Sequence, residues 1–79
     1  MPQNAPSQPH ALIVDDEPDI RELLALTLSR MDIRCSEAET VAEAKAQIAK
    51  ENFDLCLTDM RLPDGNGLDI IRYIQQAQP

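Results

Sequence analysis

Two short apolar runs, each followed at once by carboxylates, restrict the possible fold more than any other feature of this sequence. The first run, residues 11–14, precedes Asp15 and Asp16, and the second, within residues 53–58, precedes Asp59. Short apolar runs bounded by turn residues are typical of buried strands. In open α/β sheets, sites lie at the carboxyl ends of the strands, so the three carboxylates are expected to converge if the two strands are neighbours.

Three segments with helical periodicity alternate with the predicted strands. The first covers residues 18–31 and has a proline at its first position, as helices prefer. The second covers residues 41–50 and follows a capping box formed by Thr40 and Glu43, and the third covers residues 67–76. The side chains expected to face the sheet are Ile20, Leu23, Leu24, Leu28, Met31, Val41, Ala44, Ile48, Leu68, Ile70, Ile71 and Ile74.

A partly alternating strand at residues 33–38 completes the order strand–helix, repeated three times. This alternation with short connections predicts an α/β fold with a parallel sheet and right-handed crossovers. The strand at residues 11–15 has the most continuous apolar run and belongs in the middle, which gives the strand order 2-1-3. Residues 1–10 contain three prolines and no apolar period, so we expect a disordered leader in which His10 has no visible partner.

Composition and charge narrow the classes of function. The chain of 79 residues is one small domain at most, and its net charge of −7 argues against binding of nucleic acid or of an anionic membrane by this segment. No apolar run approaches the ~18 residues of a membrane span, and no signal peptide is visible, so the cytoplasm is the expected compartment. Cys35 and Cys56 would lie roughly 9–10 Å apart on the two outer strands, beyond the ~7 Å limit of a disulfide, and are expected to be free.

The convergence of Asp15, Asp16 and Asp59 itself predicts a ligand. Carboxylates this close repel one another, and a fold gains no stability from the arrangement. Mg²⁺ prefers oxygen ligands and often takes one or two carboxylates together with water and phosphate oxygens. The edge of the sheet that carries the three carboxylates is therefore a candidate magnesium site.

The loop after Asp59 contains a predicted turn. Its residues 62–65 are Leu-Pro-Asp-Gly. In such a turn proline presets its own φ, Asp64 bonds its own backbone and Gly65 accepts a positive φ. Asp59 is thus expected at the end of a strand, directly before a loop.

These residues resemble a known family. Val14-Asp15-Asp16-Glu17, followed by the spacing Asp59-x-x-x-Pro63-x-x-x-Gly67, is similar to the receiver domain of bacterial two-component response regulators, and the resemblance covers residues 11–79. The segment directly after Asp59, with the sequence Met-Arg-Leu-Pro-Asp-Gly-x-Gly-Leu, is most similar to the same segment in regulators of the NtrC type. The resemblance implies a flavodoxin-like, CheY-like topology, with Pro63 and Gly67 shaping the loop that leads away from the site.

The resemblance also implies roles for individual residues. Asp59 would be the phosphoacceptor, with a phosphohistidine of a sensor histidine kinase as the donor. Asp16 and Asp59 would bind Mg²⁺ through side-chain oxygens, Asp15 would bind it through water or tune the charge, and the backbone carbonyl of Arg61 would be a further ligand. The resemblance also implies that a second receiver domain is a partner, in a dimer.

The chain departs from the family in length. Receiver domains have five strand–helix units, whereas residues 11–79 supply three and end before a fourth strand. The family's hydroxyl residue after strand four and lysine after strand five are therefore absent. We expect the N-terminal portion of a longer, sigma-54-dependent transcriptional regulator, which would reach DNA and sigma-54 RNA polymerase only through domains outside this chain.

Two other functions remain open beside a phosphorylation-controlled switch that is not a free-standing enzyme. One is a Mg²⁺-dependent phosphohydrolase with an aspartyl nucleophile. That class needs a second aspartate two residues after the nucleophile, where this chain has Arg61. The other is a half-receiver that only binds proteins, which the missing C-terminal half favours and the intact carboxylates disfavour.

Overall fold

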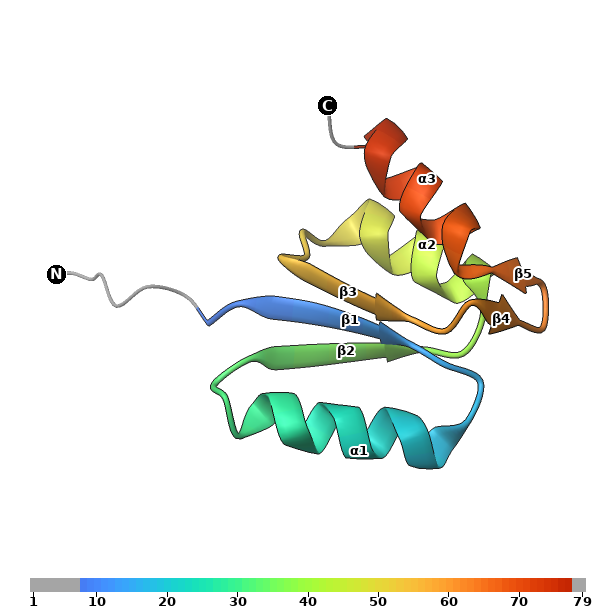
Figure 1. The fold of residues 1–79 in the computed structure, drawn as a ribbon. Helices are drawn as coiled ribbons and strands as arrows, with labels where there is room; N and C mark the ends of the chain where they lie inside the picture. The colour runs from blue at the N-terminus through green and yellow to red at the C-terminus, as the bar shows by residue number, and fades with distance from the viewer. Residues whose placement is uncertain (1–7, 78–79) are drawn as a thin grey trace, which may run out of the picture.

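The central element is β1, His10–Val14, which forms the middle strand of a three-stranded parallel sheet (Figure 1). In this computed structural model, which describes residues 8–77, β2 (Arg34–Ala38) and β3 (Leu55–Thr58) flank β1. Val14 pairs with the last residue of each neighbour, so the carboxyl ends of all three strands coincide. The predicted order 2-1-3 and the parallel pairing are confirmed.

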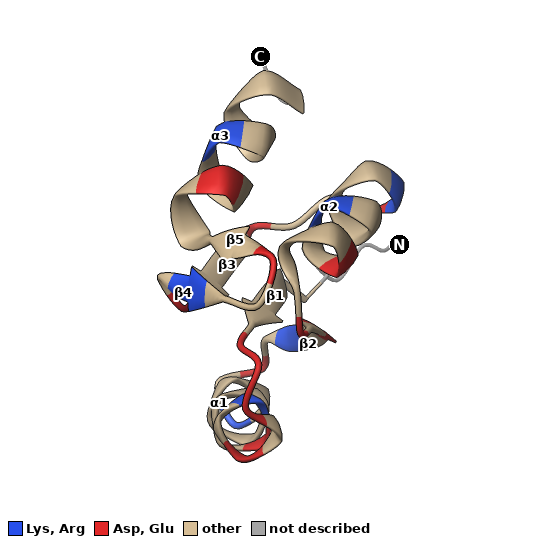
Figure 2. Cartoon of the chain, turned by 90° about the vertical axis from the view of Figure 1, so that its right-hand side faces the viewer, with Lys and Arg blue, Asp and Glu red and all other residues tan. Residues whose placement is uncertain are grey.

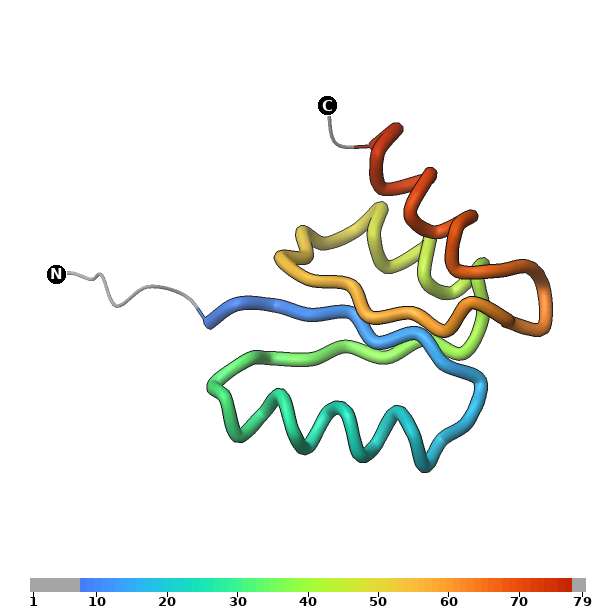
Figure 3. The backbone as a smooth tube through the Cα atoms, viewed as in Figure 1, coloured from blue at the N-terminus to red at the C-terminus, as the bar shows by residue number. Residues whose placement is uncertain are grey.

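Helices cover both faces of the sheet. The helix α1 (Pro18–Ser29) lies on one face, and α2 (Val41–Lys50) and α3 (Gly67–Ala77) lie on the other, as the backbone path in Figure 3 also shows. Pro18 occupies the start of α1 as predicted, but the helix ends before Met31, because the chain turns at Asp32 with a φ of 61°. None of the helices within residues 8–77 is long and apolar enough to cross a membrane.

The core consists of two apolar clusters on either side of β1. Leu12 and Val14 pack with α2 and with Ile70 of α3, whereas Ala11 and Ile13 pack against Leu28 of α1. Every residue of β1 is at most 5% exposed, which confirms a strand covered on both faces. The predicted inward face of α2 is likewise confirmed, and its buried residues are Val41, Ala44 and Ile48.

The predicted inward faces of α1 and α3 were too wide. Leu23 and Met31 are 60% and 62% exposed, and Leu68 and Ile71 at the side of α3 are also exposed. A three-stranded sheet is narrow, and α1 is the one described helix on its face, so only the side chains pointing straight at the sheet are covered. Periodicity alone does not report the width of the surface that a helix meets.

His10 corrects the predicted leader. It is the first residue of β1 and is 5% exposed, so the prediction of no partner was wrong, while residues 1–7 of that leader lie outside the described part of the chain. Its backbone N–H donates to Asp54 Oδ2 at 2.8 Å, and its Nε2 lies 2.8 Å from Ser36 Oγ. The ring also packs against Phe53, with 4.4 Å between ring centroids. These partners are 26 to 44 residues away in sequence, so no local sequence pattern indicates them.

Both cysteines are free, as predicted. Cys35 pairs with Ala11 and Cys56 with Leu12, so the two cysteines lie on opposite edges of β1. Both are half-buried, and burial raises the pKa of the Cys56 thiol. Its low thiolate fraction at neutral pH is typical of a structural cysteine.

The predicted turn at residues 62–65 forms the tip of a short hairpin that follows β3. Its strands β4 (Arg61–Leu62) and β5 (Gly65–Asn66) pair antiparallel. Asp64 accepts from the backbone N–H groups of Val41 at 2.7 Å and Ala42 at 3.0 Å, so it caps α2. The predicted positive φ at Gly65 was wrong, since no glycine among the described residues has one. The hairpin is therefore fixed from outside, by the free N–H groups at the start of α2.

Asp64→Asn tests this tether. The N–H groups of Val41 and then Ala42 hold the pKa of the Asp64 carboxyl below its usual value of 3.8. The carboxylate therefore stabilises the folded chain above that value, and this contribution is lost as the pH falls through the lower, folded pKa. We expect Asp64→Asn to lower Tm at neutral pH, and the difference from wild type to shrink in strong acid, as followed by circular dichroism.

Glu22→Gln on the exposed side of α1 is the matched control, because the Glu22 side chain makes no hydrogen bond within residues 8–77. It should leave Tm close to that of wild type at every pH. A Tm difference for Asp64→Asn that acid does not reduce would contradict the role of the charge.

Candidate functional site

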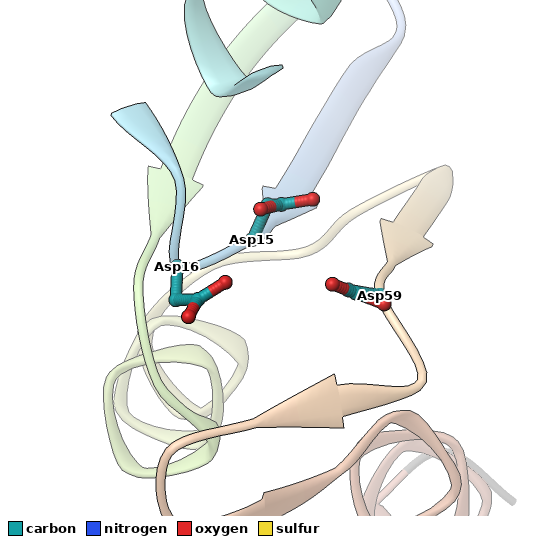
Figure 4. Close-up of side chains that lie close together, drawn as sticks. All are labelled: Asp15, Asp16 and Asp59. Carbon is teal, nitrogen blue, oxygen red and sulfur yellow. The ribbon is translucent and has the colours of Figure 1, made fainter. Parts of the chain in front are cut away.

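Three carboxylates meet at the carboxyl edge of the sheet, as the sequence predicted. Asp15 and Asp16 follow β1, Asp59 follows β3, and one oxygen from each lies within 4.8 Å of the others (Figure 4). Asp16 and Asp59 are exposed and Asp15 is half-buried. Figure 2 shows the acidic loop that joins β1 to α1 at this edge. The cluster is thus open to solvent on one side and supported by the sheet on the other.

The sheet's hydrogen bonding positions two of the three carboxylates. The N–H of Asp15 donates to the carbonyl of Ala38 at 3.1 Å, and the N–H of Asp59 donates to the carbonyl of Val14 at 3.0 Å. Each bond extends the parallel ladder one residue beyond the strand. Asp15 and Asp59 are therefore held side by side by backbone bonds, independently of their own charge.

The carboxylates of Asp15 and Asp16 differ in their hydrogen bonding. Asp15 Oδ1 accepts from the N–H of Glu17 at 2.9 Å, at the start of α1, which has no other side-chain cap. One oxygen of Asp15 is thus engaged in the loop. The carboxylate of Asp16 accepts no hydrogen bond from the described residues and extends into the space between the two loops.

Asp59 is constrained by the residues around it. Thr58 Oγ1 donates to the carbonyl of Asp59 at 2.9 Å, and the N–H of Arg61 lies 3.4 Å from Asp59 Oδ1. Arg61 begins β4 close to the cluster, and the role of its carbonyl as a ligand stays a prediction. Its side chain is exposed.

Gly67 allows a close approach of α3 to the end of β3. A Cβ at this position would lie 2.8 Å from the carbonyl oxygen of Asp59 and 3.0 Å from Thr58 Cγ2. The first contact is shorter than real Cβ atoms show, and its partner is backbone. A side chain at this position would therefore displace the backbone of Asp59 or of α3.

A cleft of about 390 Å³ adjoins the carboxylates. Its walls are apolar side chains of β1, β3 and α1, with Asp15 and Asp59 at one side. The lining residues are Val14, Asp15, Glu17, Ile20, Leu24, Leu57, Thr58 and Asp59. The site therefore has an accessible carboxylate, a group that can act as a nucleophile, and its cluster of oxygen atoms is of the kind that fits Mg²⁺.

Sequence reasoning missed Arg21, which contacts the loop that carries Asp15 and Asp16. Its Nη1 donates to the carbonyl of Asp15 at 2.7 Å. Its guanidinium also pairs with Glu37 at 3.2 Å and Glu39 at 3.1 Å. Those two acids are 16 and 18 residues away, beyond any local pattern, and only the topology brings them to α1.

Known proteins match this chain over nearly its whole length. Residues 11–79 match the response regulator receiver domain. The response regulator protein PilR of Pseudomonas aeruginosa is 63% identical over 73 residues, which make up 92% of this chain and 16% of PilR. The phosphate regulon transcriptional regulatory protein PhoB of the same organism is 40% identical over 67 residues, or 85% of this chain and 29% of PhoB.

Solved structures of response regulators have the same fold as this chain. The response regulator TrrA from Thermotoga maritima, in complex with Mg²⁺-BeF, matches with a TM-score of 0.85 and 34% identity, covering 90% of this chain and 62% of TrrA. This chain spans less than a third of the two curated relatives named above. The CheY-like topology predicted from the sequence is confirmed. The chain therefore belongs to the family of response regulator receiver domains.

Proposed function

We propose that this receiver domain accepts a phosphoryl group on Asp59 from the phosphohistidine of a sensor histidine kinase, in a reaction that requires Mg²⁺. The observation that carries the proposal is the convergence of Asp15, Asp16 and Asp59 at the carboxyl edge of the sheet. The complex of the related TrrA with Mg²⁺-BeF supports the choice of metal. The domain then acts as a signalling switch and not as an enzyme that turns over a substrate.

Asp59 is suited to the nucleophilic step. One of its carboxylate oxygens attacks phosphorus, a phosphorus–oxygen bond forms, and the bond from phosphorus to the imidazole nitrogen of the donor breaks. Asp59 is exposed, so a donor side chain can approach it. Its backbone is held by Val14 and Thr58, which limits its movement during the attack.

The neighbouring carboxylates are suited to holding the metal. Asp16 and Asp59 would bind Mg²⁺ directly, because the Asp16 carboxylate accepts no bond from the described residues. Asp15, with one oxygen bound to the Glu17 N–H, would act through water or tune the charge. The carbonyl of Arg61 would supply a further ligand. Bound Mg²⁺ would offset the negative charge of the phosphoryl oxygens and of the clustered carboxylates.

The wider protein is part of the same proposal. Residues 11–79 form the N-terminal portion of a receiver domain, and a second receiver domain is the proposed dimer partner. The 63% identity to PilR supports a response regulator, and the resemblance of the loop after Asp59 to regulators of the NtrC type supports one that acts on sigma-54 RNA polymerase. In that arrangement DNA and polymerase are contacted by other domains of the intact protein.

A phosphohydrolase is disfavoured by the residue two positions after Asp59. That position is Arg61, which is exposed and positively charged. It cannot supply the carboxyl group that such an enzyme uses as acid and base. The cluster of metal-binding side chains found within residues 8–77 consists of Asp15, Asp16 and Asp59 alone. The site thus offers a carboxylate that can accept a phosphoryl group, and Arg61 does not supply the separate acid/base carboxyl of a phosphohydrolase.

Asp59→Ala tests the phosphoacceptor. In the intact protein incubated with acetyl phosphate and MgCl₂, we expect complete loss of the phosphorylated species in intact-mass spectrometry, because no other carboxylate has the same position. Asp19→Ala in the first turn of α1 removes an acid outside the cluster and should phosphorylate like wild type. Phosphorylation that persists in Asp59→Ala would move the site elsewhere.

Asp16→Asn tests the metal site. Loss of one charged contact is worth about 1.5–3 kcal/mol, so we expect the Kd for Mg²⁺ in calorimetric titration to rise roughly tenfold to a hundredfold. Phosphorylation at a fixed, subsaturating Mg²⁺ concentration should fall in parallel. Asp19→Asn is the matched control, and an unchanged titration of Asp16→Asn would remove Asp16 from the ligand set.

A further inference from the structure

Arg21 lies where α1, the β1–α1 loop and the end of β2 meet. Its side chain is only 11% exposed, although it is charged. Three of its nitrogens reach three separate oxygens: Nη1 the carbonyl of Asp15, Nε the carboxylate of Glu37 and Nη2 that of Glu39. A buried arginine with all three acceptors at the edge of the acidic site calls for an explanation beyond stability.

The bond to Asp15 fixes the peptide unit that leads into Asp16. The carbonyl of Asp15 and the N–H of Asp16 belong to one planar peptide, so holding the oxygen at 2.7 Å from Arg21 sets the direction of the chain at Asp16. The opposite side of Asp15 is already held, because its N–H donates to Ala38. Between them, β2 and Arg21 restrict both peptides that flank Asp15.

The two glutamates fix the guanidinium itself. Glu37 and Glu39 lie at 3.2 and 3.1 Å, at the carboxyl end of β2 and just beyond it, and each takes a different nitrogen of the planar fork. The planar group therefore cannot rotate without breaking at least one of these bonds. The direction in which it points at the Asp15 carbonyl is therefore set by Glu37 in β2 and by Glu39 directly after that strand.

We infer that Arg21 is a positioning residue, which holds the β1–α1 loop in the conformation that presents Asp15 and Asp16 to Mg²⁺. The inference rests on the proposed function, since it concerns the same metal site. Arg21 does not touch the metal or the phosphoryl group. It acts through the backbone of Asp15, and its two glutamate partners balance its charge.

An electrostatic effect of Arg21 and a positioning role of Arg21 predict opposite changes in Mg²⁺ affinity when the side chain is removed. Arg21 is a cation beside three carboxylates, so by charge alone its removal would strengthen the binding of Mg²⁺. If Arg21 positions the loop, its removal weakens that binding. Residues that orient metal ligands typically change affinity by about tenfold or more when they are lost. The sign of the change in Kd therefore separates the two effects.

The experiment measures Mg²⁺ affinity by calorimetry, and exchange of the Glu17 amide by NMR, in the intact protein. Arg21→Met keeps an unbranched apolar stem like that of arginine and removes every donor, and we expect its Kd for Mg²⁺ to rise about tenfold. Its Glu17 amide, which bonds Asp15 Oδ1, should exchange faster than in wild type. Arg21→Lys restores one donor for the Asp15 carbonyl and should recover most of the affinity. Arg30→Met, at the exposed residue that caps the C-terminus of the same helix, should match wild type.

Each outcome decides between the readings. An unchanged or lower Kd in folded Arg21→Met, with unchanged exchange at Glu17, overturns the positioning role while the magnesium site stands. Failure of Arg21→Lys to recover affinity also overturns it, since the Asp15 carbonyl would then not be the contact that matters. A wild-type protein that does not bind Mg²⁺ overturns the proposed function, and this inference with it. Should Arg21→Met fail to fold, Arg21→Lys and Arg21→Gln provide the same comparison.

Discussion

The burial of β1 on both faces and along both edges determines where every other element lies. Its apolar residues need cover on each side, and α1 on one face with α2 and α3 on the other supply it. Its parallel pairing with β2 and β3 brings three strand ends into line at Val14, Ala38 and Thr58. Residues that follow these ends cannot avoid one another. The position of the site is thus a consequence of burying β1 on both faces and pairing it on both edges.

The same geometry gathers negative charge, in a chain whose net charge is already −7. Backbone bonds that do not depend on ionisation hold Asp15 and Asp59 side by side against this repulsion. Two side chains add bonds between these loops and other elements of the fold. Arg21 ties the β1–α1 loop to β2, and Asp64 ties the hairpin after β3 to α2. Each loop that carries a candidate ligand is therefore anchored to an element other than its own strand.

The parts of this structure that follow from local sequence were predictable, and the parts that depend on distant contacts were not. Apolar runs that end in carboxylates identified β1, β3 and the cluster, because strand, strand end and acid are adjacent in the chain. The glutamate partners of Arg21 and the backbone partners of Asp64 lie 16 to 23 residues away, so no short pattern contains them. His10 seemed part of a proline-rich leader, because its partners Ser36 and Asp54 come from two other segments. The partners of charged and polar side chains at strand ends depend on which segments the topology brings together, and the periodicity of apolar residues does not indicate this.

The position of β1 in the chain also bears on how the protein is made. The central strand is the first to be synthesised, whereas its neighbours end at Ala38 and Thr58. At about 5–20 residues per second, the most apolar strand remains without a paired neighbour on the order of seconds. The next element to follow it is α1, whose Leu24 and Leu28 can cover one face before any sheet exists. The order of synthesis thus favours β1 and α1 as the first pair to associate, with the carboxylate cluster completed only when the end of β3 arrives.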